Sequence, residues 1–263
     1  MRQALASKHW RQATAIVLQY KTKLLKSGLT ENTVNRRVAT IKSLVSLGRK
    51  LGICSYTLEE VKPEKVTPYR DTSGIKKQDT KRVLELCDLT TDKGLRDYAL
   101  LRLLWDNALR RNEVSQLNVE DFDLALRRLT ILGKGRGNQK EIISLSSSCS
   151  RAIADWLNVR EMEELSEPLF TNFSHAHSTR RLTGDGIYKI VRKYCKTAGI
   201  PNLMSPHRWR HGAITTVLEL SDGDIKKGLK FSRHKDPKVL MTYDDNRNQY
   251  QEQMTDLLSE LVD

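Results

Sequence analysis

The sequence predicts a mainly α-helical protein with two domains: a small helical domain and a larger, mixed helical domain with a short antiparallel β-sheet. Three observations favour this fold class. Apolar residues recur at helical spacing in most segments. Residues 62–74 contain two prolines, a glycine and little apolar content, which is typical of a linker. Two short β-prone runs flank the glycine-rich turn 133–138 and predict a hairpin. At 263 residues, the chain is long enough for two small domains or one large one.

The small domain is expected over residues 1–61. Residues 10–52 predict two helices joined at 27–30, with Thr30 as the N-cap of the second. Apolar residues of the second helix recur at helical spacing and predict a packed face: Val34, Val38, Ile41 and Val45. Three basic residues lie off that stripe: Arg36, Lys42 and Arg49. These residues predict a basic face suited to lie on DNA, although an ordinary surface helix explains this segment equally well when it is taken alone.

The larger domain is expected over residues 75–263. Helices are predicted over Thr80–Cys87, Leu95–Leu109, Cys149–Arg160, Thr183–Ala198, Trp209–Leu220 and Asp236–Tyr243. The hairpin strands are expected over Arg128–Leu132 and Glu141–Leu145. Ser205-Pro206 and Asp236-Pro237 each place a capping residue before a proline, which is typical of a helix start.

The charge of the chain points to a polyanionic partner. The formal net charge is +13 and the pI is about 9.6. Residues 1–79 hold 16 Lys and Arg against 6 Asp and Glu, a net of +10, which leaves only +3 for the rest. A single basic run is usually a solvated surface. A whole N-terminal segment with most of the excess is more typical of a protein that lies against a phosphate backbone.

The cysteines and the hydropathy indicate a soluble, cytoplasmic protein. The four cysteines are scattered without a Cys-x-x-Cys spacing, so they are expected to be reduced thiols rather than a disulfide framework or a zinc site: Cys54, Cys87, Cys149 and Cys195. No apolar stretch is long enough to span a bilayer, and Met1-Arg2-Gln3 does not open a signal peptide. We therefore expect no membrane partner.

Six reactive or cationic side chains follow one another along the larger domain: Arg110, Lys134, His207, Arg210, His234 and Tyr243. A phenol alone is a poor nucleophile, but cations and imidazoles that converge on one phosphate make it a competent one. Taken singly, each residue has an ordinary structural interpretation, such as a surface arginine, a polar turn or a half-buried tyrosine. The hypothesis of a catalytic site rests on the ordered set.

The local contexts of these residues carry a resemblance. The motifs are Ala108-Leu109-Arg110-Arg111-Asn112-Glu113, Gly133-Lys134-Gly135, His207-Arg208-Trp209-Arg210-His211 and Phe231-Ser232-Arg233-His234, followed by the tyrosine nine residues later. In this order they resemble the tyrosine recombinase (phage integrase) family. The resemblance runs from about Trp10 to Asp245 and is most specific after Ala99. It implies a helical DNA-clamping domain over 1–61 and a catalytic domain over 75–263.

The resemblance also implies a role for each residue. Tyr243 would attack a scissile DNA phosphate and form a 3′-phosphotyrosyl link. Arg110 and Arg210 would neutralise charge on the transition state. His207 would assist proton transfer, and His234 occupies the position of the histidine in the family's usual Leu-Gly-His.

Two further roles concern the residues around that set. Lys134 would protonate the leaving 5′ oxygen, with Lys140 as the alternative donor. Glu113 lies one helical turn after Arg110 and would hold its guanidinium in place.

Three departures from the family pattern carry expectations of their own. Ala108 replaces a usual glycine. Arg233 replaces the glycine of the usual Leu-Gly-His, which is expected to alter how closely this loop approaches DNA. Relatives have a further helix before Trp10, so the clamp is either shortened or the chain truncated.

A metal site is the alternative interpretation of His207 and His211, which are four residues apart. A zinc-protease helix would need Glu at position 208, where this chain has Arg208, and the surplus of cations disfavours a metal. We expect neither a metal nor a cofactor. Because one phosphodiester is exchanged for another of similar energy, the implied reaction also needs no ATP.

The expected partner is double-stranded DNA, with a homotetramer in the synaptic complex and a monomer or weak oligomer off DNA. The C-terminal stripe that would dock on a neighbouring copy, or fold back on its own domain, is Tyr250, Met254, Leu257, Leu258 and Leu261. Two other functions remain open from the sequence: a type IB topoisomerase, and an inert DNA-binding architectural protein with the same fold.

Overall fold

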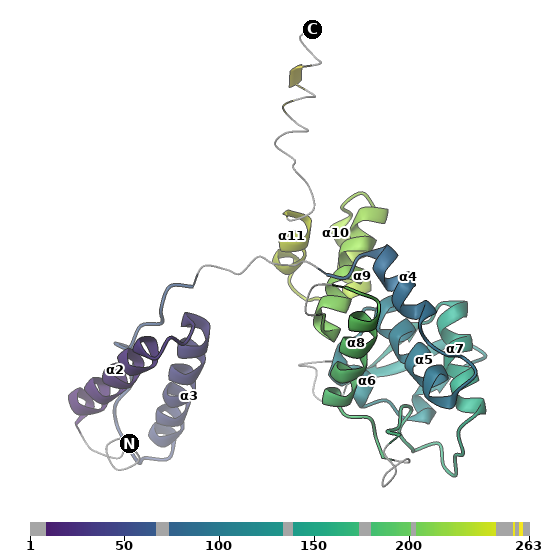
Figure 1. The fold of residues 1–263 in the computed structure, drawn as a ribbon. Coiled ribbons are helices and arrows are strands. Elements are labelled where there is room, and N and C mark those ends of the chain that lie inside the picture. Colours follow the sequence, from purple (N-terminus) through teal and green to yellow (C-terminus); the bar gives the residue numbers. More distant parts are fainter. Residues whose placement is uncertain are drawn as a thin grey trace. The chain divides into compact units, whose positions relative to one another are not determined.

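The computed structural model describes residues 9–66, 74–133, 139–173, 180–200 and 204–245, together with residues 255, 258 and 259. The chain separates into two compact units, Met1–Tyr69 and Arg70–Asp263. Helices predominate in both units (Figure 1), and the second also carries a small three-stranded antiparallel sheet. The predicted fold class is therefore confirmed. In the described part of the chain, no helix is long and apolar enough to cross a membrane.

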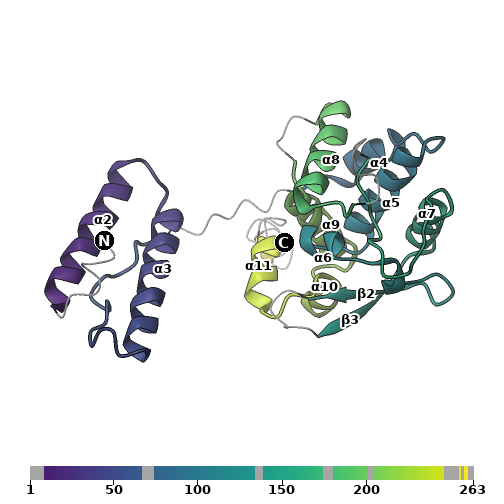
Figure 2. The ribbon, with the colours of Figure 1, turned by 90° about the horizontal axis from the view of Figure 1, so that it is seen from below.

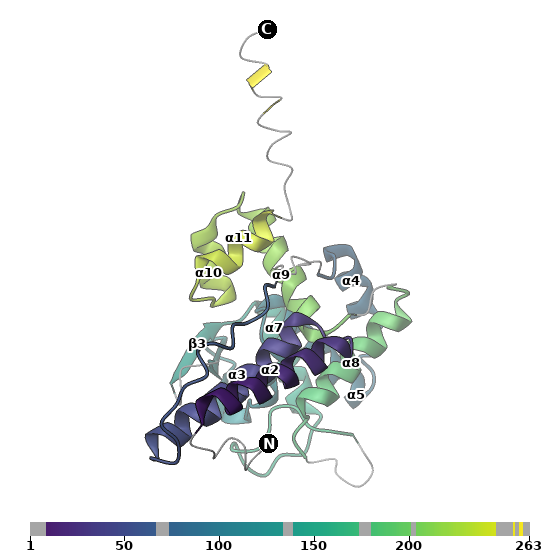
Figure 3. The same ribbon diagram turned by 90° about the vertical axis from the view of Figure 1, so that its left-hand side faces the viewer.

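The first unit is built on two helices, α2 (Trp10–Lys26) and α3 (Glu31–Lys50), which pack against each other (Figure 3). Their shared core is apolar and consists of Ala13, Val17, Leu24, Val34, Val38, Val45, Tyr56, Leu58 and Val61. The valines of the predicted stripe are buried there, so the apolar residues at helical spacing form the contact between the two helices of this unit.

The segment after these helices is fastened to the first unit. The side chain of Asn35 donates to the Glu64 carbonyl at 2.9 Å and accepts from the Glu64 N–H at 2.8 Å. Lys21 pairs with the Glu64 carboxylate at 2.6 Å and donates to the Lys62 carbonyl at 2.6 Å. Lys62 and Glu64, which lie in the predicted linker, are therefore held against the helices.

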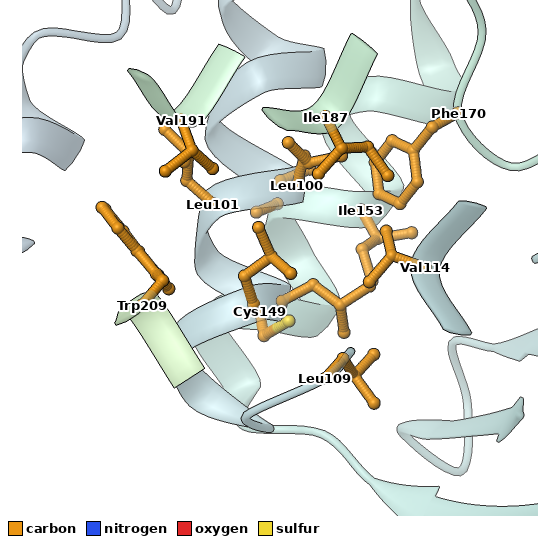
Figure 4. Close-up of a cluster of buried hydrophobic side chains, with 14 of the residues drawn as sticks. Leu100, Leu101, Leu109, Val114, Cys149, Ile153, Phe170, Ile187, Val191 and Trp209 are labelled. Atoms are coloured by element: carbon orange, nitrogen blue, oxygen red, sulfur yellow. The ribbon is translucent and has the colours of Figure 1, made fainter. Parts of the chain in front are cut away.

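The second unit is organised around one central helix. Its helices are α4 (Lys77–Glu85), α5 (Asp92–Asp106), α6 (Arg111–Ser115), α7 (Ser147–Asn158), α8 (Gly184–Thr197), α9 (Pro206–Leu220), α10 (Ile225–Ser232) and α11 (Pro237–Asp245), with a 3-10 turn η1 (Val119–Asp121). Helices α4, α6, α7 and α9 contact α5. Leu100 and Leu101 of α5 are fully buried in a core to which α7, α8 and α9 also contribute (Figure 4). This core fixes the helices that carry the candidate site.

The sheet has the order β1-β2-β3, with strands β1 (Phe122–Asp123), β2 (Arg128–Leu132) and β3 (Lys140–Ser144). Figure 2 shows β2 and β3 side by side. Leu129 pairs with Ile143, and Ile131 pairs with Glu141. The predicted hairpin is formed by β2 and β3, although β3 begins and ends one residue earlier than expected. Strand β1 was not predicted, because a strand of two residues is too short to show an alternation of apolar and polar residues.

Helix α10 was also not predicted. Asp224 caps it by accepting the Lys227 N–H at 2.9 Å. Gly228 lies inside it, and glycine disfavours a helix in isolation. Here glycine permits close packing, because a methyl group at this position would meet Leu218 at 2.8 Å and Leu240 at 3.2 Å. Tertiary packing therefore stabilises a helix that local propensity does not favour.

Helix α9 is held at its middle by the start of the second unit. The Ile75 N–H donates to the Arg208 carbonyl at 3.3 Å. Gly212 lies against the same segment, since a methyl group there would come within 2.1 Å of the Ile75 carbonyl oxygen. This close backbone approach positions the helix that carries three of the side chains described below.

Candidate active site

The turn between α5 and α6 presents Arg110. Ala108 adopts a left-handed conformation (φ 45°) and is fully buried, which turns the chain after α5. Arg110 then caps α6: its N–H donates to Glu113 Oε2 at 2.8 Å, and its Nη1 donates to Glu113 Oε1 at 2.7 Å. The Glu113 side chain is only 3% exposed, whereas that of Arg110 is 29% exposed. Glu113 thus binds both the backbone N–H and the guanidinium of Arg110, whose side chain still reaches the surface.

The electrostatics of Glu113 follow from these contacts. Burial alone would raise the pKa of its carboxyl group, but the Arg110 backbone N–H and the charges of Arg233 and Arg110 outweigh burial and lower that pKa. The group is therefore a carboxylate at neutral pH and a permanent hydrogen-bond acceptor.

Arg210 lies on α9 and is almost wholly buried. Nη1 donates to the Ala108 carbonyl, and Nη2 donates to the Ser232 carbonyl and contacts His234 Nε2 at 3.3 Å. These contacts, counted over the described residues, use three of the five guanidinium N–H groups. Arg210 therefore joins the turn before Arg110 to the turn that carries His234, and it retains donors for an anionic ligand.

The imidazole rings of His207 and His234 are neutral at pH 7. Desolvation, then the charges of Arg210, Arg110 and Arg233, lower the pKa of His234 to about 4. Desolvation and the charges of Arg210 and Arg110 also lower the pKa of His207. Because Arg210 can only donate to His234, Nε2 of that ring is the acceptor and Nδ1 carries the proton. The His207 ring can therefore take up a proton, whereas the acceptor nitrogen of His234 is already used by Arg210.

Tyr243 lies in α11, which contacts both α9 and α10 (Figure 1). Its side chain is buried in a small apolar cluster with Ala108, Ile214 and Leu240. Its ring centroid is 4.9 Å from that of His211 and 6.3 Å from that of His234. Burial raises the pKa of the phenol, and the charges of Arg210 and Arg110 act against that rise. The hydroxyl is therefore protonated at neutral pH and must lose its proton to act as a nucleophile.

Five of the six candidate catalytic residues can be placed, and four of them are linked by hydrogen bonds or ring contacts to one cluster. Arg210 contacts His234, the Tyr243 ring lies near those of His234 and His211, and His207 joins them through His211, whose Nε2 lies 2.8 Å from His207 Nε2. Arg110 is bound to Glu113, and its charge lowers the pKa values of Arg210 and His234 in the cluster. Lys134 lies outside the described residues. The alternative donor, Lys140, pairs with Asp121 at 3.2 Å.

The candidate DNA-binding residues lie in the first unit. Arg36 and Arg49 are exposed on α3, and Lys42 is half-buried.

Sequence reasoning missed two side chains of this cluster. His211 was part of a family motif and a possible metal ligand but was given no role in the site, yet it contacts both His207 and Tyr243. Arg233 was expected only to alter how closely its loop approaches DNA, whereas its side chain is 7% exposed and donates to Glu113 Oε2 at 3.1 Å. The i,i+4 spacing of the histidines was a signal for the first, whereas no local pattern predicts the inward path of Arg233.

The charge of the cluster suits an anion. The guanidinium groups of Arg110 and Arg233 pair with the carboxylate of Glu113, and its charge also acts on Arg210. The charge of Glu141 acts on Arg233. Desolvation and the charges of Arg110 and Arg233 lower the pKa of Arg210 to about 10. Excess buried positive charge of this kind is relieved when a phosphate binds, because the low local dielectric strengthens the attraction.

Comparison with known proteins identifies the family. The model of the phage integrase family matches residues 74–250. The chain belongs to this family. A tyrosine recombinase of Synechocystis sp. is 46% identical over 251 residues, which cover 95% of this chain and 80% of that protein. One from Synechococcus elongatus is 41% identical over 95% of this chain and 78% of its own length. The predicted family and the enzyme class, a tyrosine recombinase, are thereby confirmed.

Solved structures of this fold include DNA complexes. The XerH site-specific recombinase bound to palindromic difH substrate, in a post-cleavage complex, aligns with a TM-score of 0.71 at 20% identity. The alignment covers 94% of this chain and 72% of XerH. A lambda integrase dimer bound to a COC′ core site aligns with a TM-score of 0.65 at 11% identity, covering 90% of this chain and 81% of that one. At these identities the likeness concerns the fold.

Proposed function

We propose that this family member is a site-specific DNA recombinase that cleaves and rejoins duplex DNA through a 3′-phosphotyrosyl intermediate on Tyr243. One observation carries the proposal: the buried Arg210 guanidinium bonds to the turn before Arg110 and to the turn carrying His234, beside the ring of Tyr243. The complexes of XerH and lambda integrase with DNA support DNA as the partner. The net charge of +13 is consistent with that partner.

In the cleavage step, the phenol oxygen of Tyr243 forms a bond to phosphorus and the bond from phosphorus to the 5′ oxygen breaks. Charge accumulates on the non-bridging oxygens of the pentacoordinate transition state. Arg110 and Arg210 are fixed before the reaction, Arg110 by Glu113 and Arg210 by two carbonyls, so they stabilise that charge without reorganising.

Two protons move in this step. The phenol proton leaves to an imidazole, for which the neutral His207 is the candidate, with His211 between His207 and the Tyr243 ring. The departing 5′ oxygen takes up a proton and leaves as a hydroxyl, a role that the family resemblance assigns to Lys134. The reverse step begins when the 5′ hydroxyl of a partner duplex attacks the phosphotyrosine.

A pool of nicked suicide duplexes with a randomised core tests the proposal. Cleavage next to a nick releases a short fragment, so religation fails and the covalent protein–DNA complex accumulates. We expect recovered complexes to converge on one DNA site. Strand exchange between two duplexes that carry this site would then distinguish recombination from topoisomerase-like relaxation. The absence of any covalent complex across the pool would favour an inert DNA-binding protein.

We also propose that the first unit clamps DNA and that four copies assemble around two duplexes. Exposed Arg36 and Arg49 on α3 and the net charge of +10 over residues 1–79 support the clamp. The C-terminal stripe supports the assembly. It lies outside the described residues except for Leu258, which is 66% exposed.

The assembly has its own test. A variant with Leu257→Asp and Leu261→Asp is expected to bind a single site normally but to lose synapsis and strand exchange. Full recombination by this folded variant would refute assembly through the C-terminal segment.

A further inference from the structure

Arg233 occupies a backbone position that strongly favours glycine. It follows the last turn of α10 in a left-handed conformation (φ 57°), where residues with a side chain are uncommon. An arginine there is strained unless its side chain makes compensating contacts. Such outliers gather at functional sites, where the surrounding structure maintains them.

The side chain of Arg233 turns inward and bridges two parts of the fold. Nη1 donates to the Asn107 carbonyl at 3.0 Å, and Nη2 donates to Glu113 Oε2 at 3.1 Å. Longer contacts reach the Ala108 carbonyl at 3.4 Å and the Phe231 carbonyl at 3.3 Å. One guanidinium therefore links the α10–α11 turn to the α5–α6 turn, which lies far earlier in the chain.

The two linked turns share an unusual feature. Ala108, like Arg233, has a positive φ without being glycine. The Ala108 carbonyl is the acceptor of Arg210 Nη1 and lies 3.4 Å from Arg233 Nη2. Two strained turns, one before Arg110 and one before His234, are thus fastened to each other by guanidinium groups.

The contact with Glu113 extends this effect to Arg110. Oε2 of Glu113 accepts from both the Arg110 backbone N–H and Arg233 Nη2, while Oε1 accepts from Arg110 Nη1. Arg233 therefore restrains the carboxylate that orients the guanidinium of Arg110. A change at Arg233 would rotate or free that carboxylate and leave Arg110 without a fixed direction.

We propose that Arg233 is a positioning residue, which holds Arg110 through Glu113 and holds the His234 turn against the α5–α6 turn. This inference rests on the proposed function, because it concerns how the site is oriented for a phosphate. It also explains how the chain accommodates arginine at a glycine position: the backbone strain is offset by four acceptors.

The positive charge of Arg233 adds a second readout. His234 faces Arg210 and His207 from α9, Arg110 from the α6 turn, Tyr243 from α11 and Arg233 from its own turn. Removal of one of these positive charges should move the pKa of His234 upward from about 4, toward its ordinary value.

The test compares Arg233→Gly with Arg127→Gly, which also replaces an arginine in a left-handed conformation (φ 47°) but lies in the turn between β1 and β2, outside the cluster. Both variants accept the left-handed backbone, and only the first removes the guanidinium that binds Glu113. Cleavage of the suicide duplex in a single turnover, DNA affinity and thermal stability are measured for both. We expect Arg233→Gly to cleave on the order of tenfold more slowly or worse at nearly unchanged DNA affinity, because small misplacements of catalytic groups cost this much. Arg127→Gly should stay near the wild-type rate.

Conservative variants and an NMR titration complete the test. Arg233→Lys keeps the charge without the fork, so it should recover only part of the rate. If Arg233→Gly is unstable, Arg233→Asn replaces it, since asparagine tolerates positive φ. Titration of the His234 ring by NMR needs no cleavage, and it should show a higher pKa in the glycine variant.

Wild-type cleavage rates with an unchanged His234 pKa in Arg233→Gly would overturn the proposal. If the wild type itself forms no covalent complex, the proposed function fails, and the NMR titration still decides the role of Arg233.

Discussion

Replacement of Arg210 by alanine is expected to change the unfolding free energy only modestly but to slow DNA cleavage strongly. Two opposing terms act on stability. The fall in the pKa of Arg210 to about 10 corresponds to about 3 kcal/mol of unfavourable charge burial, which the variant removes. The variant also leaves the Ala108 and Ser232 carbonyls without this donor, at about 1–3 kcal/mol each. The unfolding free energy should therefore stay within about 3 kcal/mol of the wild type.

No opposing effect offsets the loss of cleavage rate. Loss of one preorganised donor to a transition-state oxygen typically costs about 100-fold to 1,000-fold in rate. Single-turnover formation of the covalent complex on a nicked duplex measures this loss, with urea unfolding and DNA affinity measured in parallel. Arg151→Ala, which removes one exposed positive charge on α7, is the matched control and should cleave normally.

Two results would contradict this reasoning. A variant that cleaves within a fewfold of wild type would show that Arg210 does not face the reacting phosphate. A variant whose cleavage falls only as far as its DNA affinity would make Arg210 a binding residue without a part in the transition state.

Three further predictions concern other parts of the molecule. The pKa of His234 is about 4 in the folded protein, well below its value in the unfolded chain, so the unfolded chain takes up a proton first as the pH falls from about 6.5 to 4. The free energy of unfolding should therefore fall by up to about 3 kcal/mol between these pH values. His234→Gln should reduce that pH dependence in urea unfolding, leaving the smaller contribution of His207, whereas an unchanged slope would refute the assignment. Replacement of Arg36, Lys42 and Arg49 by alanine should lower the log–log salt slope of DNA binding by about 0.9 for each phosphate that the protein no longer neutralises, and an unchanged slope would remove these residues from the interface. Gly212→Ala should destabilise the second unit by about 1–3 kcal/mol, because the added methyl group meets the Ile75 backbone; thermal unfolding at wild-type temperature would show that the backbone moves aside at little cost.

Regular periodicity made much of the fold predictable. The valine stripe of α3 forms the core of the first unit, and the glycine-rich turn between two β-prone runs marked β2 and β3. Spacing within a helix also predicted one contact of the site, that of Arg110 with Glu113 three residues later. These features depend on residues close in sequence.

The remaining features depend on contacts between distant segments. Helix α10 needs Gly228 to pack on Leu218 and Leu240, and its own sequence does not indicate that support. The inward path of Arg233 depends on acceptors near position 110, and the burial of Arg210 depends on the carbonyls of two turns. A single sequence records the identities of these residues but not where their partners lie, so it identified the candidates and missed how they are held.

Peptide mapping of the covalent protein–DNA complex tests the central claim most directly. The complex formed on a nicked duplex is digested with protease and nuclease, and mass spectrometry locates the residue that carries the nucleotide. We predict a 3′-phosphate attached to Tyr243 in wild type, and no complex from Tyr243→Phe, which should retain nearly full DNA affinity because only the hydroxyl is removed. A nucleotide attached to another residue, such as Tyr250, or a complex formed by Tyr243→Phe would contradict the assignment of the nucleophile.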